Sequence, residues 1–255
     1  MHRKIFASAA VLALTVIGAV APPANATHSW SGYHWARTAN PFTLKLGDNV
    51  TSVWDSYLGT TSADWTVSTV LDTTIVPGST TPKKCAATAG MVQVCNAAYG
   101  QRGWLGIASI NINGSHITQG TVKVNDTYFS TAPYNTPEWR NLVMCQEVGH
   151  TLGLDHQDED FANADLNTCM DYSNNPLPNQ HPNAHDYDQL VSIYTHLDAT
   201  TTVGAAVPAS AGGEVGNSEA SWGTLVDGSR ARGASTYVKD LGNGEKAVTH
   251  VIWAR

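Results

Sequence analysis

The segment from Cys145 to His156 constrains this 255-residue chain more than any other stretch. If its first part is helical, Gln146 and His150 project from one face and Glu147 lies beside them. Gly153 permits a sharp exit from the helix, which can bring His156 back toward His150. We therefore expect a fold in which two imidazoles and a carboxylate converge at the end of a helix.

This group of side chains suits metal-assisted hydrolysis. Imidazole nitrogens are common ligands of divalent metals, and a catalytic metal lowers the pKa of bound water toward ~7. Glu147 is placed to take the proton from that water. The predicted reaction is hydrolysis of an amide, assisted by a divalent metal.

The segment resembles the metzincin metalloprotease signature H-E-x-x-H-x-x-G-x-x-H, particularly in its matrixin-like form. Glu147, His150, Gly153 and His156 match it in type and spacing, and Gln146 replaces the first ligand histidine. Downstream, Cys169-Met-Asp-Tyr172 is similar to the Met-turn of this clan, where a Tyr in this position can approach the metal. The resemblance covers roughly residues 28–198.

The resemblance implies a secreted zinc endopeptidase that hydrolyses peptide bonds through a metal-activated water, with Glu147 as general base. Tyr172 would be a second catalytic residue, and His150, His156 and Gln146 would be metal ligands. The expected partner is a protein or peptide substrate. It would bind by adding a strand to the sheet edge supplied by residues 106–124, against a wall formed by residues 173–185.

Gln146 leaves three alternatives open. An amide oxygen is a poorer zinc donor than imidazole, so Gln146 or a water completes a weaker site. His181 or His185 of the wall segment could instead supply the third nitrogen. In the third alternative the chain is a catalytically inactive metzincin-like pseudoprotease that binds a peptide or protein.

Apolar periodicity together with the resemblance predicts an α+β fold. It comprises a metzincin-like mixed twisted sheet, an active-site helix, a Met-turn, a closing helix and a small C-terminal β-hairpin. The active-site helix should start at Thr136-Pro-Glu138, which supplies an N-cap, a first-turn proline and an acidic residue. Strands are expected at residues 42–46, 70–76, 91–95, 106–112 and 120–124, and further helices at 53–65 and 186–194.

The ends of the chain suggest four segments. Residues 1–26 have the basic start, apolar run and Ala24-Asn-Ala26 cleavage site of a signal peptide, so we expect secretion. Residues 27–198 form the catalytic domain, the small-residue stretch 199–217 is a linker, and residues 218–255 form the hairpin extension. No later stretch is long and apolar enough to span a membrane, and we expect a monomer.

Charge and cysteine content narrow the partners and the compartment. A formal net charge of −7 repels phosphate backbones, which makes nucleic acid an unsuitable partner. Four cysteines in a secreted chain favour two disulfides. Three connectivities are possible, and we favour the local pairs Cys85–Cys95 and Cys145–Cys169.

Overall fold

A computed structural model describes residues 28–205 and 215–255. The predicted signal peptide and most of the predicted linker, residues 206–214, lie outside the described residues. Strands of the described part form a single nine-stranded mixed sheet. Their bounds are β1 His34–Trp35, β2 Phe42–Asn49, β3 Leu71–Pro77, β4 Val92–Ala97, β5 Trp104–Asn113, β6 His116–Asn125, β7 Thr224–Ser229, β8 Ala234–Gly242 and β9 Glu245–Trp253.

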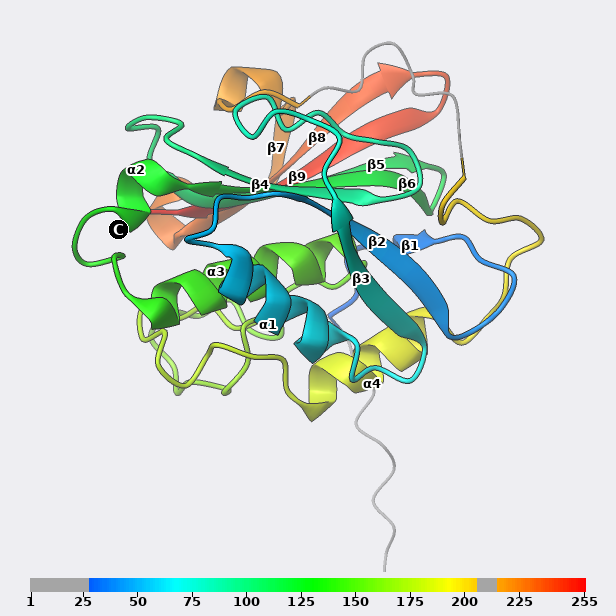
Figure 1. Cartoon of the computed structure of the whole chain (residues 1–255), viewed down its shortest axis with the longest axis horizontal. Coiled ribbons are helices and arrows are strands. Elements are labelled where there is room, and N and C mark those ends of the chain that lie inside the picture. The colour runs from blue at the N-terminus through cyan, green and yellow to red at the C-terminus, as the bar shows by residue number, and fades with distance from the viewer. Residues whose placement is uncertain (1–27, 206–214) are drawn as a thin grey trace, which may run out of the picture.

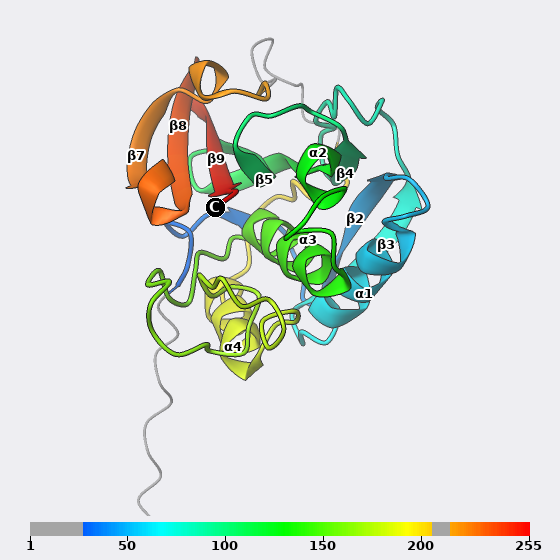
Figure 2. The ribbon, with the colours of Figure 1, turned by 90° about the vertical axis from the view of Figure 1, so that its left-hand side faces the viewer.

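The sheet has a parallel half and an antiparallel half. Its strand order is β3-β2-β4-β6-β5-β9-β8-β7, with β1 paired to β6. Strands β3, β2, β4 and β6 are parallel, and every pairing from β6 to β7 is antiparallel. Figure 2 shows β7, β8 and β9 as one wing of the sheet, continuing directly from β5.

Three main helices cover one face of the sheet (Figure 1). They are α1 Asp55–Trp65, α3 Pro137–Thr151 and α4 Ala184–Ile193, and a short helix α2, Asp126–Phe129, follows β6. Thr136 caps α3 by accepting from the backbone N–H of Trp139, with Pro137 in the first turn, as the sequence predicts. Asn183 and Asp186 form a capping box at the start of α4. Two single-turn 3₁₀ helices, Glu219–Ser221 and Arg230–Arg232, complete the chain.

The predicted α+β class with a mixed sheet is confirmed, and all five predicted strands and three predicted helices are present within a few residues of their expected bounds. The short strand β1 and the edge strand β7 were not predicted. Their sequences show little alternation of apolar and polar residues. Their strand conformation therefore depends on pairing with a neighbouring strand.

Apolar side chains pack on both faces of the sheet. On the helical face, Trp35, Trp65, Leu142 and Met170 belong to one large buried core. On the other face a smaller core joins Trp104, Trp222 and Trp253 with their neighbours. Along β5 and β9, successive side chains point to opposite faces of the sheet and therefore contribute to both cores. This explains why residues of the C-terminal extension are buried.

Both favoured disulfides are confirmed. Cys85 pairs with Cys95, and Cys145 pairs with Cys169. The second bridge ties the middle of α3 to the segment that contains Met170. It therefore fixes the two parts of the chain on which the predicted site depends.

The expectation that residues 106–124 supply a free sheet edge is wrong for this conformation. Strand β5 is paired with β6 on one side and with β9 on the other, over residues 104–113 and 245–253. The free edges of the main path are β3 and β7. The C-terminal extension is therefore part of the main sheet, because its hairpin β8–β9 finds on β5 the surface that an isolated hairpin lacks.

Within residues 28–205 and 215–255, no helix has both the length and the apolar character needed to cross a bilayer.

The close packing of α3 against the Met170 segment makes a stability prediction. A Cβ at Gly149 would lie 2.6 Å from Met170 Sδ and 2.7 Å from a ring carbon of Trp65. We expect Gly149→Ala to lower the free energy of unfolding by about 1–3 kcal/mol, because these buried groups have to move. Urea unfolding followed by tryptophan fluorescence measures the change.

The matched control is Gly59→Ala in α1, where a Cβ would meet nothing within 4 Å. Alanine in an open helical position should leave stability unchanged or raise it by up to about 1 kcal/mol. Equal effects of the two substitutions would contradict the packing argument.

Candidate metal centre

Helix α3 and the turn that follows it bring His150 and His156 together. Gly153 has a φ of +94°, a conformation that turns the chain sharply after α3. The His150 Nδ1 atom lies 2.9 Å from the carbonyl oxygen of Leu154 within this turn. The Nε2 atoms of the two imidazoles are 3.1 Å apart. The local geometry expected from the sequence is therefore present.

A third imidazole reaches the same point from the C-terminal extension. His250 lies on β9, and its ring centroid is 4.1 Å from that of His150 and 4.6 Å from that of His156. One ring nitrogen from each of the three residues falls within a 4.8 Å cluster. All three side chains are buried. His250 was not predicted as a site residue, because a single histidine in an otherwise apolar strand carries no metal-ligand spacing.

The hydrogen-bond state of these nitrogens fits a cation. A backbone carbonyl can only accept, so His150 carries its proton on Nδ1 and presents a lone pair at Nε2. The Nε2 atom of His250 is buried and has no hydrogen-bond partner among the described residues. Three neutral imidazoles around one point form the donor set of many catalytic zinc sites. The residues present therefore fit a zinc ion.

The electrostatics of the pocket keep the imidazoles neutral. Burial is the main cause that lowers the pKa of His150, His156 and His250, the last to about 3. For His150 and His156 the neighbouring imidazoles lower the pKa further. Neutral imidazole is the form that binds a metal.

Glu147 is fully buried beside the three imidazoles. Its Oε2 atom lies 3.5 Å from Nδ1 of His250, and its Oε1 atom has no hydrogen-bond partner among the described residues. Burial raises the pKa of Glu147 well above its ordinary value, and the backbone of Ala108 opposes this shift more weakly. The carboxyl group can thus orient His250 and hold a proton next to the imidazole cluster.

Gln146 is buried at the same level of α3 and faces the Met-turn segment. Its Nε2 donates to the carbonyl oxygen of Cys169 at 2.8 Å and lies 3.4 Å from that of Asp171. Its Oε1 is buried without a hydrogen-bond partner among the described residues. The amide nitrogen is therefore occupied, and the oxygen stays available as a donor.

Tyr172 packs against the centre. Its ring centroid is 4.0 Å from that of His156, and the ring stacks on Phe161 at a centroid distance of 4.9 Å. Burial raises the pKa of Tyr172 far above its ordinary value. It is therefore a neutral phenol beside the predicted ligands.

The two wall histidines lie elsewhere. His181 Nδ1 is 2.7 Å from a carboxylate oxygen of Asp64, and its side chain is half exposed. His185 stacks on His28 at a centroid distance of 4.9 Å at the start of α4. Neither belongs to the described imidazole cluster, where His250 occupies the third position instead.

The centre is shut off from solvent, and an open depression lies next to it. This depression, of about 780 Å³, is lined by residues 158–162, Asn174 and the C-terminal residues Ala231, Arg232 and Arg255. Phe161 separates it from Tyr172, which in turn contacts His156. Phe161 and Tyr172 therefore link the lining of the depression to the imidazole cluster.

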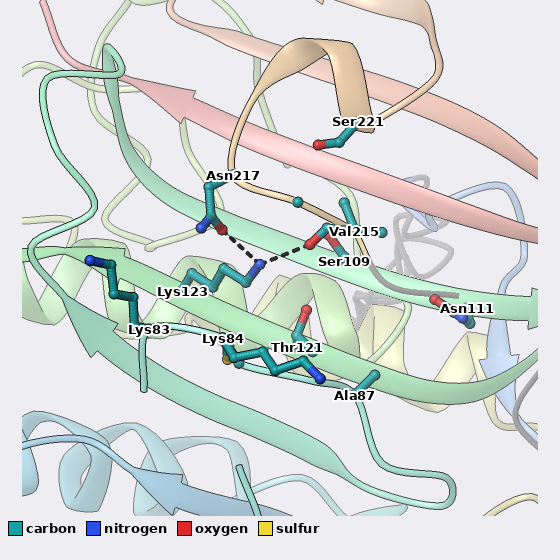
Figure 3. Close-up of a pocket in the computed structure, with 12 residues that line it drawn as sticks. Lys83, Lys84, Ala87, Ser109, Asn111, Thr121, Lys123, Val215, Asn217 and Ser221 are labelled. Carbon is teal, nitrogen blue, oxygen red and sulfur yellow. Dashed lines mark hydrogen bonds between the residues drawn. The ribbon is translucent and has the colours of Figure 1, made fainter. Parts of the chain in front are cut away.

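A separate cavity of about 390 Å³ opens on the other face of the sheet (Figure 3). There Nζ of Lys123 donates to the carbonyl oxygen of Val215 and to Oδ1 of Asn217, each at 2.9 Å. These bonds tie the end of the predicted linker, just before the C-terminal extension, to β6. The cavity thus belongs to the attachment of the extension and is remote from the imidazoles.

Comparison with known proteins leaves the family of the chain open. No family model matches it, and no curated protein matches its sequence. Among solved structures it is similar to high choriolytic enzyme 1, a hatching enzyme zinc-protease from the medaka fish Oryzias latipes. The match has a TM-score of 0.36 and 12% identity, and covers 67% of this chain and 99% of that one. A likeness at this level does not establish a family.

The geometry predicts that His250 contributes more to zinc binding than Gln146 does. Loss of an orienting outer partner typically costs 10–100-fold in metal affinity, so we expect His250→Ala to cost at least ~100-fold. Gln146→Ala should cost less than ~10-fold. Competition with a chromophoric chelator measures both dissociation constants.

The control is His181→Ala, which removes a histidine that is paired with a carboxylate outside the cluster. It should leave the zinc dissociation constant unchanged. A larger loss in Gln146→Ala than in His250→Ala would assign the third position to the amide oxygen.

Proposed function

We propose that the chain is a secreted zinc-dependent endopeptidase that acts on a protein or peptide substrate. The observation that carries the proposal is the convergence of His150, His156 and His250 beside the buried carboxyl group of Glu147. Such a group has the donor set of a hydrolytic zinc site and an acid–base residue next to it.

Each residue has a distinct role in this proposal. His150, His156 and His250 hold the metal, and Gln146 contributes its free amide oxygen as a weaker donor. Bound zinc supplies Lewis acidity and makes water acidic enough to react near neutral pH. A bound cation would favour the carboxylate form of Glu147, which would take the proton from the attacking water and return it to the leaving amine. Tyr172 donates a hydrogen bond to the developing oxyanion.

The described conformation is a closed form of the proposed enzyme. Arg232 Nη2 donates to Glu159 Oε2 at 3.0 Å, and the guanidinium of Arg255 lies 3.8 Å from the centre of the Phe161 ring. We name these two contacts the clasp, since they join the C-terminal extension to the loop over Tyr172. Opening of the clasp would expose Tyr172 and His156 to the depression.

Removal of the proposed base should separate chemistry from metal binding. We expect Glu147→Gln to lower hydrolysis of fluorescently labelled, denatured casein by about 10²–10⁴-fold, which is the usual contribution of a general base. The zinc content should stay at wild-type level, because the glutamine oxygen still faces His250. Elemental analysis and the initial rate of fluorescence release measure the two effects.

Wild-type hydrolysis that is retained in Glu147→Gln would mean that Glu147 is not the base. Tyr172→Phe is the companion variant, since it keeps the ring that packs on His156 and removes only the hydroxyl group. It should lower the rate and leave zinc content unchanged.

Weakening of the clasp should raise activity. Partly exposed ion pairs contribute about 0.2–1 kcal/mol, so Arg232→Ala should increase the rate of casein hydrolysis by about 1.4- to 5-fold if opening limits access. Arg102→Ala is the matched control, because Arg102 is an exposed arginine that does not line the depression. An unchanged rate in Arg232→Ala would contradict the proposed role of the clasp. It would leave the proposed chemistry unaffected.

The burial of the centre favours a second candidate function. Strand β9 occupies the edge at which a substrate strand was expected, and none of the three imidazoles lines the depression of about 780 Å³ or the cavity of about 390 Å³. In this alternative the chain is an inactive metzincin-like pseudoprotease that binds a peptide or protein, with zinc as a structural ion. Zinc-loaded protein that leaves casein intact, both as wild type and as Arg232→Ala, would establish it.

A further inference from the structure

A second cluster of imidazoles lies away from the candidate metal centre, and no role has been assigned to it above. It consists of His34 at the start of β1, His116 at the start of β6, and His196 and Asp198 after α4. Parallel pairing of β1 with β6 sets His34 directly beside His116. Figure 1 shows β1 and the segment after α4 at the same end of the sheet. Three distant parts of the chain therefore meet at these four side chains.

The donor atoms converge on one carboxylate oxygen. Asp198 Oδ1 lies 3.2 Å from Nε2 of His116, 3.6 Å from Nε2 of His34 and 3.7 Å from Nε2 of His196. The Nε2 atoms of His34 and His196 are 3.1 Å apart. Ligands at zinc bond lengths in a tetrahedron are separated by roughly 3.3 Å. The donor atoms of His34, His196 and Asp198 are spaced as three ligands of one zinc ion would be, and His116 lies outside this group.

Outer contacts fix the orientation of the two most buried donors. Nδ1 of His34 lies 2.8 Å from the carbonyl oxygen of Gly32, so His34 carries its proton there and presents a lone pair at Nε2. Asp198 Oδ2 accepts from Nη1 of Arg37 at 2.9 Å and from the backbone N–H of Arg37 at 3.2 Å. This leaves Oδ1 to face the imidazoles. Carbonyl and charged partners of this kind are typical of the outer shell of metal sites.

Three electron-pair donors face one another in this cluster. Nε2 of His34 lies 3.1 Å from Nε2 of His196 and 3.6 Å from Asp198 Oδ1. When His196 carries its proton on Nδ1, a zinc ion between these atoms can accept a lone pair from each of them. His116 and His196 are partly exposed, with 37% and 51% of their side-chain surface accessible, so an ion can enter from solvent.

We propose that His34, His196 and Asp198 form a second zinc site with a structural role. The ion would fasten the segment after α4 to the start of β1. Because its ligands come from two segments far apart in the chain, a bound zinc ion would stabilise the folded state. The site needs neither the candidate metal centre nor proteolytic activity.

Zinc stoichiometry tests the proposal. The purified full chain is stripped with a chelator, reloaded with zinc chloride, desalted and measured by elemental analysis. We expect two zinc ions per chain in the wild type and one in the double variant His116→Ala/His196→Ala. His150→Ala/His156→Ala should also hold one, and His181→Ala, which removes a histidine outside both clusters, should hold two.

The outcomes separate the two sites. If the wild type binds one zinc ion and His116→Ala/His196→Ala binds none, the second site is supported. The candidate metal centre then does not bind zinc. One ion that persists in that variant, or two ions in both proteins, overturns the proposal. So does a wild type that binds no zinc.

Thermal unfolding gives a readout that does not depend on stoichiometry. In the His150→Ala/His156→Ala background, zinc chloride should raise Tm, because zinc binds the folded chain at the second site. The rise should disappear when His196→Gln is added, a change at a half-exposed side chain that the fold tolerates. A Tm rise that persists in this variant would also overturn the proposal.

Discussion

The register between β5 and β9 is the constraint on which the candidate metal centre depends. Antiparallel pairing sets His250 opposite Ala108, on the face of the sheet that packs against α3. Successive residues of a strand point to opposite faces, so a slip of one residue would turn His250 to the other face and bury Val251 against Glu147. The same register places Trp253 in the smaller core, where it packs beside Trp222. Apolar burial on both faces therefore fixes the position of a polar ligand.

In the proposed enzyme, this arrangement supplies a third imidazole although the motif has Gln146 at its first position. In the metzincin signature that residues 146–156 resemble, all three ligands come from one helix and the turn after it. Here α3 supplies His150, the turn supplies His156, and a strand from the far end of the chain supplies His250. The strand that completes the donor set also covers the β5 edge, so ligand supply and access to the centre are coupled through β9. The Cys145–Cys169 bridge holds the opposite wall in place.

Both histidine clusters follow one physical logic. In each, a backbone carbonyl fixes the tautomer of a buried imidazole, Leu154 for His150 and Gly32 for His34. The lone pair of that imidazole then points to a place where further nitrogens gather. They differ in their carboxylate, because Glu147 is fully buried beside its cluster, whereas Asp198 lies at a partly exposed edge and is held by Arg37. A buried free acid suits proton transfer, and a fixed carboxylate suits a ligand.

The sequence by itself determined what depends on near neighbours in the chain. The cap at Thr136, the helical placement of Glu147 and His150, the turn at Gly153 that returns His156, and the two local disulfides all follow from spacing over a few residues. The tertiary structure decided the third imidazole, the closed β5 edge and the second cluster, because each depends on pairing between residues far apart in the chain. A lone histidine in an apolar strand has no spacing that marks it as a ligand. Only the register of β9 on β5 turns His250 toward His150.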